Sequence, residues 1–396
     1  MRLLAVHHGG GVGGAPVSLV KLLAALEPAD FQPRLILTEP GPIAPYARAA
    51  DVPVGVVRTG GAFFYSAHAR LGARTMARFV STFPGAVQTA RRVLRREQPD
   101  LVHLNTSVLL AWAVAARREH LPVVWMVREV LGPSPRLRRW HARFILHHAR
   151  TVVAISGAVA ACFPLAVPVV HNAVDLREFQ PAAPGTTEDV LRELGVPAGV
   201  RLVTMLGAVQ REKGHWLMLE ALRRLPSDVH LLLVCGGVDA AYGQSLRGKI
   251  KRGLRMPLDH LDALLRDAGR LGLRHRLHVT GFRHDVPRML TITDVLAFPS
   301  LQPEGFGRPI IEAMAMARPV VATSVGPSAE ILGADAGRVV APESARLADA
   351  VAELLRDSDL RARMGAAGRS RVEREFSLER QVAAMQRIYR QARPRA

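Results

Sequence analysis

The sequence predicts an α/β protein with two doubly wound units of parallel sheet. Short apolar runs alternate with longer amphipathic stretches along the chain, a pattern typical of parallel strands that helices cover on both faces. The runs form two series, separated by the Pro-, Gly- and Thr-rich stretch QPAAPGTTEDV at residues 180–190. A chain of 396 residues is also too long for one ordinary core. We therefore expect a first domain over residues 1–179 and a second domain from residue 180.

Each series supplies its own set of expected strands. The first set comprises Leu3–Val6, Leu35–Thr38, Val54–Val57, Leu101–Leu104, Val123–Val127, Thr151–Ile155 and Val167–Val170, with helical character between most of them, for example over Pro16–Leu26 and Gln88–Glu97. The second set comprises Leu202–Leu206, Val229–Val234, Leu277–Thr280, Val295–Phe298, Val320–Thr323 and Arg338–Val340. In doubly wound sheets, ligands bind beyond the carboxyl ends of the strands. Two such units facing each other make a cleft, so we expect the functional site there.

The stretch HHGGGVGGAPVS at residues 7–18 is a glycine-rich loop between a strand and a helix. Gly9, Gly11 and Gly14 have the G-x-G-x-x-G spacing of a dinucleotide-binding loop. Glu39 ends the second strand, roughly where a ribose-binding acid belongs in such a fold. An NAD-dependent oxidoreductase is therefore one interpretation, although this spacing alone is a weak signal.

Basic charge is concentrated in one part of the chain. The formal net charge is +19, and residues 58–150 hold 16 Arg against four acidic residues, a net of +12. This asymmetry predicts an anionic partner, such as a phosphorylated acceptor or an acidic membrane. Nucleic acid is not expected, because no stacking aromatic residues are interleaved with the basic ones. The stretch PRLRRWHARFILHHAR at residues 135–150 could lie on an anionic bilayer, or could pack its Leu137, Trp140, His141 and Phe144 stripe inward.

The most specific stretch is PSLQPEGFGRPIIEAMAMARPVVATSVGPSAEIL at residues 299–332. It reads as a strand end, a loop broken by Gly305 and Gly307, and the start of a helix. Glycines let backbone amides approach a ligand closely, and a helix N-terminus attracts phosphate. Glu304 in the loop and Glu312 on the helix could accept hydrogen bonds from sugar hydroxyls while the amides hold phosphate.

This stretch closely resembles the signature of the retaining family-4 glycosyltransferases, or glycosyltransferase group 1, which have the GT-B fold. Other stretches resemble the family in the same order along the chain: VVHNAVDLREF (169–179), GAVQREKGHWLMLEAL (207–222), LHVTGFRHDVPRMLTITDVLAFPS (277–300) and FSLERQVAAMQRIYR (376–390). The resemblance implies two Rossmann-like domains facing across a cleft. The N-terminal domain, 1–179, would bind the acceptor, and the domain over 180–375 would bind a nucleotide sugar. A C-terminal helix, 376–396, would pack back towards the N-terminal domain.

The resemblance also implies roles for individual residues. Glu312 would bind the ribose hydroxyls of the donor, Glu304 the transferred sugar, and Lys213 the leaving diphosphate. The amides of Phe306, Gly307 and Arg308, next to Gly305, would hold the sugar and diphosphate. The loop of Gly281, Phe282 and Arg283 would contact the base. Gly13 and Gly14 would line the cleft opposite the donor diphosphate.

The chain departs from the family pattern at two positions that bear on catalysis. Ala208 stands where the family has an arginine that helps to hold the diphosphate, and Arg211 is the candidate to replace it. Arg128 stands where the family has a histidine beside the transferred sugar, with Glu129 after it. Arg128 could stabilise charge on the departing diphosphate, or it could be a structural partner of Glu129 or of another acid in the cleft.

Together these observations predict a retaining, metal-independent glycosyltransferase of the cytoplasm, with no cofactor beyond its nucleotide-sugar donor. The acceptor would be a glycan, a lipid-linked precursor or a small molecule. If the anionic partner is an acidic membrane, we expect the protein to contact the inner membrane face peripherally. A catalytically weakened sugar-nucleotide-binding protein is the alternative that Ala208 and Arg128 suggest. The spacings of His7, His8, His103 and His171 fit no metal site, so we expect hydrogen-bonded lining residues.

Overall fold

The computed structural model describes residues 1–66, 72–181, 187–235 and 259–393. The chain divides into two compact units. The first unit comprises Met1–Ala173, Pro303–Phe306 and the segment from Phe376, and the second comprises Val174–Gln302 and Gly307–Glu375. The division falls after Ala173, six residues before the boundary that the sequence predicted. Residues 182–186 of the predicted linker lie outside the described part.

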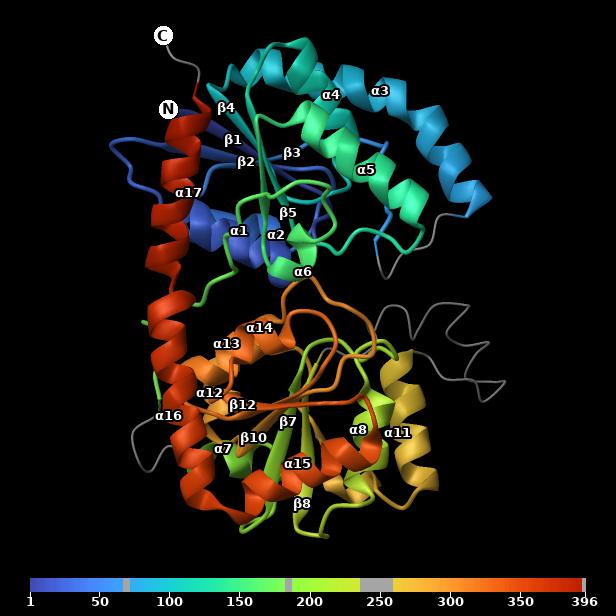
Figure 1. Cartoon of the computed structure of the whole chain (residues 1–396), viewed down its shortest axis with the longest axis vertical. Coiled ribbons are helices and arrows are strands. Elements are labelled where there is room, and N and C mark those ends of the chain that lie inside the picture. The colour runs from blue at the N-terminus through green and yellow to red at the C-terminus, as the bar shows by residue number, and fades with distance from the viewer. Residues whose placement is uncertain (67–71, 182–186, 236–258, 394–396) are drawn as a thin grey trace. The chain divides into compact units, whose positions relative to one another are not determined.

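The first unit is built on a six-stranded parallel sheet with the order β3-β2-β1-β4-β5-β6 (Figure 1). Its strands are β1 (Arg2–His7), β2 (Gln32–Leu37), β3 (Val54–Val56), β4 (Leu101–Leu104), β5 (Val123–Val127) and β6 (Thr151–Ala154). β4 and β5 are buried at every position, as expected for strands covered on both faces. The strand order reverses between β1 and β4, and ligands bind at such a reversal in doubly wound sheets.

Helices connect and cover these strands. They are α1 (Gly14–Ala24), α2 (Ile43–Ala49), α3 (Ala73–Glu97), α4 (Leu110–Arg118), α5 (Pro135–His148), α6 (Gly157–Ala160) and α17 (Leu378–Ala392). α17, at the C-terminal end of the chain, packs against α1 and β5 of this unit. α3 begins well before the predicted start at Gln88 and contains Pro84 in its interior. Proline usually breaks a helix, because it has no backbone N–H for the carbonyl four residues earlier, but α3 continues through Pro84.

The predicted strand Val167–Val170 is wrong. In the structure Val169 forms only an isolated parallel bridge with Ala154. Pro168 lacks a backbone N–H, so a continuous ladder cannot form there, although the Pro168 carbonyl still accepts a bond of 2.9 Å from the Ala154 amide. The remaining predicted strands are confirmed to within a few residues at their ends.

The second unit is built on another six-stranded parallel sheet, with the order β12-β11-β10-β7-β8-β9. Its strands are β7 (Arg201–Leu206), β8 (Val229–Val234), β9 (Leu277–Val279), β10 (Val295–Phe298), β11 (Val320–Thr323) and β12 (Gly337–Val340). Its helices are α7 (Thr187–Glu193), α8 (His215–Leu222), α11 (His260–Arg270), the 3-10 turn η1 (Arg274–Arg276), α12 (Val286–Thr291), α13 (Arg308–Ala315), α14 (Ser328–Leu332), α15 (Ser344–Arg356) and α16 (Ser358–Glu375). Counted in chain order within each unit, the two sheets have the same strand order, and the second reverses between β7 and β10.

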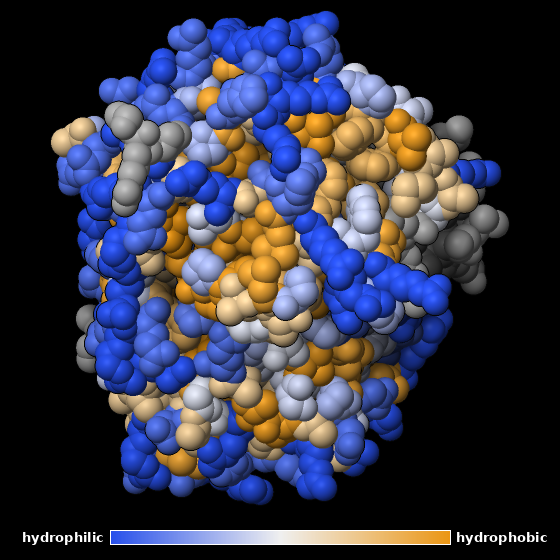
Figure 2. Space-filling model, turned by 45° about the horizontal axis from the view of Figure 1, so that its top comes forward, coloured by the Kyte–Doolittle hydropathy of each residue, from blue (hydrophilic) through white to orange (hydrophobic). Residues whose placement is uncertain are grey.

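The molecular surface is mixed in character. Figure 2 shows one face on which hydrophilic stretches border hydrophobic patches. Among the large apolar side chains, Val80 of α3 and Trp140 of α5 are 61% and 45% exposed. Within the described ranges, no helix combines the length and the apolar character needed to cross a membrane.

Candidate functional site

Two loops meet at the strand reversal of the second unit. One loop follows β7 and the other follows β10, and the two strands are neighbours in register, with Val203 opposite Val295. The Leu301 amide donates to the Glu212 carbonyl at 2.7 Å. A Cβ on Gly214 would lie 1.8 Å from the Pro299 carbonyl oxygen, so only glycine allows this approach. The loops therefore form one packed unit beyond the carboxyl ends of β7 and β10.

Glycines with positive φ shape this edge of the sheet. Gly207 (φ +109°) ends β7, and Gly307 (φ +118°) precedes α13 as its N-cap. Neither residue has a side chain that would cover the neighbouring amides. The Lys213 ammonium lies 3.3 Å from the point where a Cβ on Gly207 would be. A lysine charge and the N-terminus of a helix are thus both present at this strand reversal, an arrangement suited to an anion.

Glu312 is fixed by an ion pair on its own helix. The Arg308 guanidinium donates to the carboxylate at 2.6 Å across one turn of α13. The two side chains are only 19% and 10% exposed, which favours a persistent geometry. Arg308 orients one carboxylate oxygen, and the other is the group that could accept from a ligand hydroxyl.

Arg211, the predicted replacement for the missing arginine, lies on an aromatic ring. Its guanidinium carbon is 4.3 Å from the centre of the Trp216 ring, a cation–π contact. Arg211 and Ala208 are both exposed. The role of Arg211 in binding a diphosphate stays a prediction.

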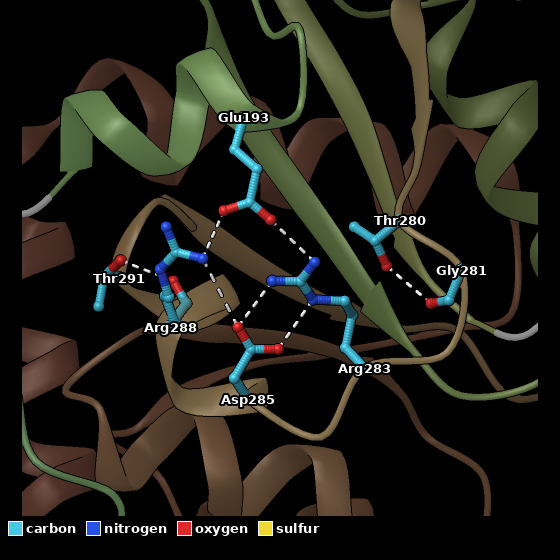
Figure 3. A network of polar contacts seen from close by, with 7 residues as sticks. All are labelled: Glu193, Thr280, Gly281, Arg283, Asp285, Arg288 and Thr291. Carbon is cyan, nitrogen blue, oxygen red and sulfur yellow. Dashed lines mark hydrogen bonds and ion pairs between the residues drawn. The ribbon is translucent and has the colours of Figure 1, made fainter.

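The loop predicted to contact the base is anchored through charged side chains (Figure 3). Arg283 makes a bidentate pair with Asp285, at 2.8 and 2.7 Å, and a further bond of 2.9 Å to Glu193 at the end of α7. Arg288 pairs with the same Glu193. The guanidinium of Arg283 is engaged by two carboxylates, while Gly281 has φ +77° and the Phe282 ring is 56% exposed.

These ion pairs also lower the pKa values of the two carboxyl groups that take part in them. Hydrogen bonds from Arg283 hold the pKa of Asp285 below its usual range. Hydrogen bonds from Arg288 and Arg283 lower the pKa of Glu193 in the same way. The Glu193 carboxylate on α7 thus holds the loop through Arg283 and Arg288, and the Asp285 carboxylate orients Arg283 within the loop.

In the first unit, the glycine-rich loop runs from the end of β1 to α1. Gly13 is the N-cap of α1, and Gly14 is its first residue. The tight contact falls on Gly10, where a Cβ would lie 2.3 Å from the Pro40 carbonyl oxygen. By contrast, nothing lies within 4 Å of a Cβ built on Gly11. One glycine of the loop is thus required for packing, whereas Gly11 leaves open space.

Arg128 follows β5 and is buried, with 5% of its surface exposed. Its Nε donates to Asn105 Oδ1 at 2.7 Å, and its Nη1 donates to Asn172 Oδ1 at 2.6 Å. The Glu129 carboxylate accepts instead from the backbone amides of Ser107, at 2.9 Å, and Arg128, at 3.3 Å. The sequence offered Glu129 or another acid of the cleft as a structural partner, whereas these two contacts of the guanidinium go to neutral amide oxygens.

Of the four histidines singled out in the sequence, His7, His8 and His103 are hydrogen-bonded through their rings, as predicted. His8 bonds to Thr106 at 2.9 Å, and buried His103 bonds to Tyr389 of α17 at 2.9 Å. Burial lowers the pKa of His103 to about 3, so it is neutral at physiological pH. Burial also lowers the pKa of His7 well below its usual value, and the nearby charge of Arg128 adds to the effect.

Asn105 and Tyr389 belong to this site although the sequence did not reveal them. Asn105 could have been found, because it is a polar residue directly after the buried strand β4. Tyr389 carries no such signal, since its helix is far away in the sequence.

The segment with Glu304, Gly305 and Phe306 groups with the first unit. The Ser156 hydroxyl donates to the Gly305 carbonyl at 2.7 Å, and a Cβ on Gly305 would lie 1.9 Å from the Arg128 carbonyl oxygen. Phe306 is buried beside the rings of His171 and Phe376. The rest of the signature, residues 299–302 and 307–332, belongs to the second unit.

Comparisons with known proteins identify the family. Residues 12–178 match the model for glycosyltransferase family 4, and residues 187–371 match that for glycosyl transferases group 1. The alpha-maltose-1-phosphate synthase of Mycobacterium tuberculosis is 30% identical over 346 residues, covering 80% of this chain and 84% of the relative. The chain belongs to glycosyltransferase family 4. The glycosyltransferase is also 26% identical over 307 residues to the lipopolysaccharide core biosynthesis mannosyltransferase LpsB of Rhizobium meliloti, covering 73% of this chain and 83% of LpsB.

Solved structures show that the glycosyltransferase has the GT-B fold. HepE of Anabaena, solved in complex with UDP-glucose, matches with a TM-score of 0.80 at 24% identity, covering 99% of this chain and 100% of HepE. The two parallel sheets of the present structure agree with that assignment. The oxidoreductase interpretation of the glycine-rich loop is therefore wrong, because the loop belongs to a glycosyltransferase.

Proposed function

We propose that this glycosyltransferase transfers a sugar from a nucleoside-diphosphate sugar with retention of the anomeric configuration. The observation that carries the proposal is the strand reversal of the second unit. Lys213 lies in the loop after β7, and the loop after β10 leads into the N-terminus of α13, whose first turns carry the Arg308–Glu312 pair. The charge and the open amides suit a diphosphate, and the oriented carboxylate suits a vicinal diol such as a ribose. UDP-glucose in the complex of HepE is consistent with this class of donor.

In the proposed reaction the protein supplies orientation and charge rather than a nucleophile. The bond between the sugar C1 and the diphosphate oxygen breaks as the acceptor oxygen bonds to C1 on the same face. The acceptor hydroxyl gives its proton to an oxygen of the departing diphosphate. Lys213 and Arg128 would stabilise the negative charge that grows on that diphosphate, and Glu304 would hold the sugar.

No metal or further cofactor is part of the proposal. Lys213 and the helix N-terminus would neutralise the diphosphate, the task that a divalent ion performs in other transferases. Within the described residues, no group of three or more His, Cys, Asp or Glu is placed to hold a metal ion. Full activity after exhaustive chelation is expected, and loss of activity that magnesium or manganese restores would contradict metal independence.

The donor is tested by binding and by turnover. A thermal-shift panel of UDP, GDP and ADP with their glucose, mannose and N-acetylglucosamine derivatives should raise the melting temperature for one nucleotide class. NMR of the product should then show the anomeric configuration of the donor. A protein that binds the donor but neither hydrolyses nor transfers its sugar would instead be the catalytically weakened binder, and an inverted product would overturn retention.

The proposed acceptor is an anionic glycan precursor, lipid-linked or soluble, bound by the basic first unit on the cytoplasmic side. The outward face of α5 supports a membrane-associated version. Arg136, Arg139, Arg143, Trp140, Phe144 and His147 line a surface hollow of about 740 Å³. The inward residues of α5 are His141, Ala142 and Ile145, so the alternative of an inward stripe holds for His141 but not for Trp140, which is 45% exposed. Arginines beside an exposed tryptophan are typical of helices that lie on anionic bilayers.

Sedimentation with liposomes tests that version. The protein should bind phosphatidylglycerol vesicles at low salt and lose most of the binding at about 0.5 M salt, since the attraction is screened. Trp140→Ala with Arg139→Ser should weaken the binding, while Arg223→Ser on the second unit serves as a charge control. Absence of binding at low salt would leave a soluble anionic acceptor.

A further inference from the structure

A continuous chain of buried polar groups connects the C-terminal helix of the first unit to Arg128. Its members lie at the carboxyl edge of β1, β4 and β5, in the segment around Asn172, and on α17. All are at most 5% exposed: His7, His103, Asn105, Arg128, Asn172 and Tyr389. Buried polar groups are costly unless each one is paired, so the hydrogen bonds among them determine how the edge is built.

Each hydrogen bond among these buried polar groups can be assigned one donor and one acceptor. A guanidinium only donates, so Asn105 Oδ1 is the acceptor of the 2.7 Å bond from Arg128 Nε. His103 Nε2, 3.4 Å from the same oxygen, must then carry the proton. The neutral ring leaves its Nδ1 as an acceptor, so the Tyr389 hydroxyl donates to it at 2.9 Å. Burial raises the pKa of Tyr389, which keeps that donor protonated.

The other end of the Asn105 amide is assigned by the same logic. Its Nδ2 donates to His7 Nδ1 at 3.1 Å, so the proton of neutral His7 is on Nε2. One tautomer of each histidine therefore satisfies every bond. A flipped Asn105 would set its NH2 group against two donors, which selects a single orientation of the amide.

α17 also reaches the second acceptor of Arg128. Gln381, one of its buried residues, donates through Nε2 to the carbonyl of His171 at 2.7 Å. His171 directly precedes Asn172, whose side chain accepts from Arg128 Nη1 at 2.6 Å. α17 thus holds the Asn105 side chain through His103, and it holds the backbone next to Asn172 through Gln381.

We propose that Tyr389 and His103 are positioning residues for Arg128, and that α17 thereby orients the guanidinium for sugar transfer. The inference rests on the proposed role of Arg128 in that reaction. Two neutral amide oxygens, those of Asn105 and Asn172, orient the guanidinium through these contacts. A small rotation of Asn105 would displace the guanidinium, and misplaced charge reduces turnover more than binding.

A double-mutant cycle tests this coupling. Tyr389→Phe removes one hydroxyl without leaving a large cavity, and it should lower kcat on the order of fivefold while the Kd of the nucleoside diphosphate is unchanged. In an Arg128→Ala background the same substitution should have no further effect on kcat. Equal losses in both backgrounds would overturn the proposal. Tyr65→Phe is the matched control, because Tyr65 is equally buried in this unit but bonds to the Ser134 backbone, at 2.8 and 3.4 Å.

Two substitutions of His103 separate positioning from stability. Gln can reproduce the donor at Nε2 and its bond to Asn105, whereas Asn can reproduce only the acceptor at Nδ1 and its bond to Tyr389. Both should lower the melting temperature, but His103→Asn should lose on the order of tenfold in kcat and His103→Gln much less. Equal kcat for the two folded variants would overturn the proposal.

Arg128→Ala distinguishes failure of the proposed role of Arg128 from failure of the positioning role of Tyr389 and His103. Wild-type turnover in this variant would remove Arg128 from the proposed reaction, and the positioning inference would fall with it. A strong loss in Arg128→Ala together with full activity in Tyr389→Phe and His103→Asn would overturn only the positioning inference. Turnover is followed as nucleoside diphosphate released from UDP-glucose, GDP-mannose, ADP-glucose and UDP-N-acetylglucosamine, well below the melting temperature of each variant.

Discussion

The two units have the same strand order but form the carboxyl edges of their sheets in different ways. In the second unit the backbone shapes the edge: Gly207, Gly214 and Gly307 have positive φ, and the loops after β7 and β10 touch through main-chain atoms. In the first unit the edge is built from buried side chains, with His103, Asn105 and Arg128 bonded to one another. The same topology thus supports one edge shaped by glycine and another shaped by a polar network.

This difference decides how each edge tolerates change. A backbone contact with no room for a Cβ is lost entirely when a side chain is added. When a side-chain network loses one hydrogen bond, the protein can stay folded, but the remaining side chains of the network are oriented less well. We therefore expect substitutions in the second unit to act on folding and donor binding, and those in the first unit to act mainly on turnover.

The largest effect is expected at Gly214. Gly214→Ala would bring a Cβ to 1.8 Å from the Pro299 carbonyl oxygen at φ +74°, and should cost about 3 kcal/mol or more of stability. Gly11→Ala in the first unit meets nothing within 4 Å and should change stability by less than about 0.5 kcal/mol. Thermal denaturation of both variants checks the contrast, and similar melting temperatures would contradict it.

Next in size is the loss of Arg128. Arg128→Ala should lower kcat on the order of 100-fold while the affinity for the nucleoside diphosphate changes little, because the charge that it stabilises grows toward the transition state. The variant also leaves the oxygens of Asn105 and Asn172 without this donor, so some stability is lost as well. Arg128→His, the residue of the resembling family, should recover part of the turnover. Single-turnover kinetics and calorimetry separate the two effects, and a loss confined to affinity would contradict the assignment.

A smaller effect on binding is expected at Glu312. Glu312→Ala removes the partner of Arg308 and the proposed ribose acceptor, so the nucleoside diphosphate should bind about 1–3 kcal/mol more weakly. Glu220→Ala breaks an exposed pair with Arg223 in the same unit and is the control. Calorimetry with UDP and GDP measures both, and unchanged affinity in folded Glu312→Ala would remove Glu312 from the site.

The most gradual effect is a response to acid. Burial lowers the pKa of His141 in the first unit and of His215 in the second to about 4. Below about pH 6.5 these histidines are protonated in the unfolded chain but stay neutral in the folded chain. The free energy of unfolding therefore decreases as the pH falls to about 4, by at most about 1.4 kcal/mol per pH unit for each histidine.

The first unit should be the more sensitive to acid. Besides His141, burial lowers the pKa of four of its histidines (His7, His8, His103 and His148), and besides His215 it lowers that of two in the second unit (His230 and His278). Trp112, Trp125 and Trp140 report on this unit, and Trp216→Phe removes the tryptophan of the second. Fluorescence of that variant should change at a higher pH than circular dichroism of the whole chain. Coincident transitions would contradict the difference, and His141→Phe should reduce the pH dependence.

Features that depend on local sequence could be predicted from the chain alone. Apolar runs such as Leu101–Leu104 and Val320–Thr323 specify buried parallel strands, because each residue in them must avoid water on both faces of the sheet. The start of α13 at Arg308, after Gly307 and before Pro309, follows from backbone geometry that glycine and proline set locally. The loop and helix start around Glu304 and Glu312 could be predicted for the same reason, since the glycines and the first helical residues are adjacent in the sequence.

Only the tertiary structure decided which side chains meet. Asn105 and Asn172, which accept hydrogen bonds from the Arg128 guanidinium, lie 23 and 44 residues away, whereas the structural partner that the sequence offered was the adjacent Glu129 or another acid of the cleft. Tyr389 reaches His103 across 286 residues, and no local pattern encodes such a pair. Trp140 is exposed on α5 although its spacing fits an inward stripe, because helical periodicity defines a face but not its partner. Local propensity therefore specified the strands and the glycine-shaped edge of the second unit, while the polar edge of the first unit exists only once separate segments, distant in the sequence, have packed together.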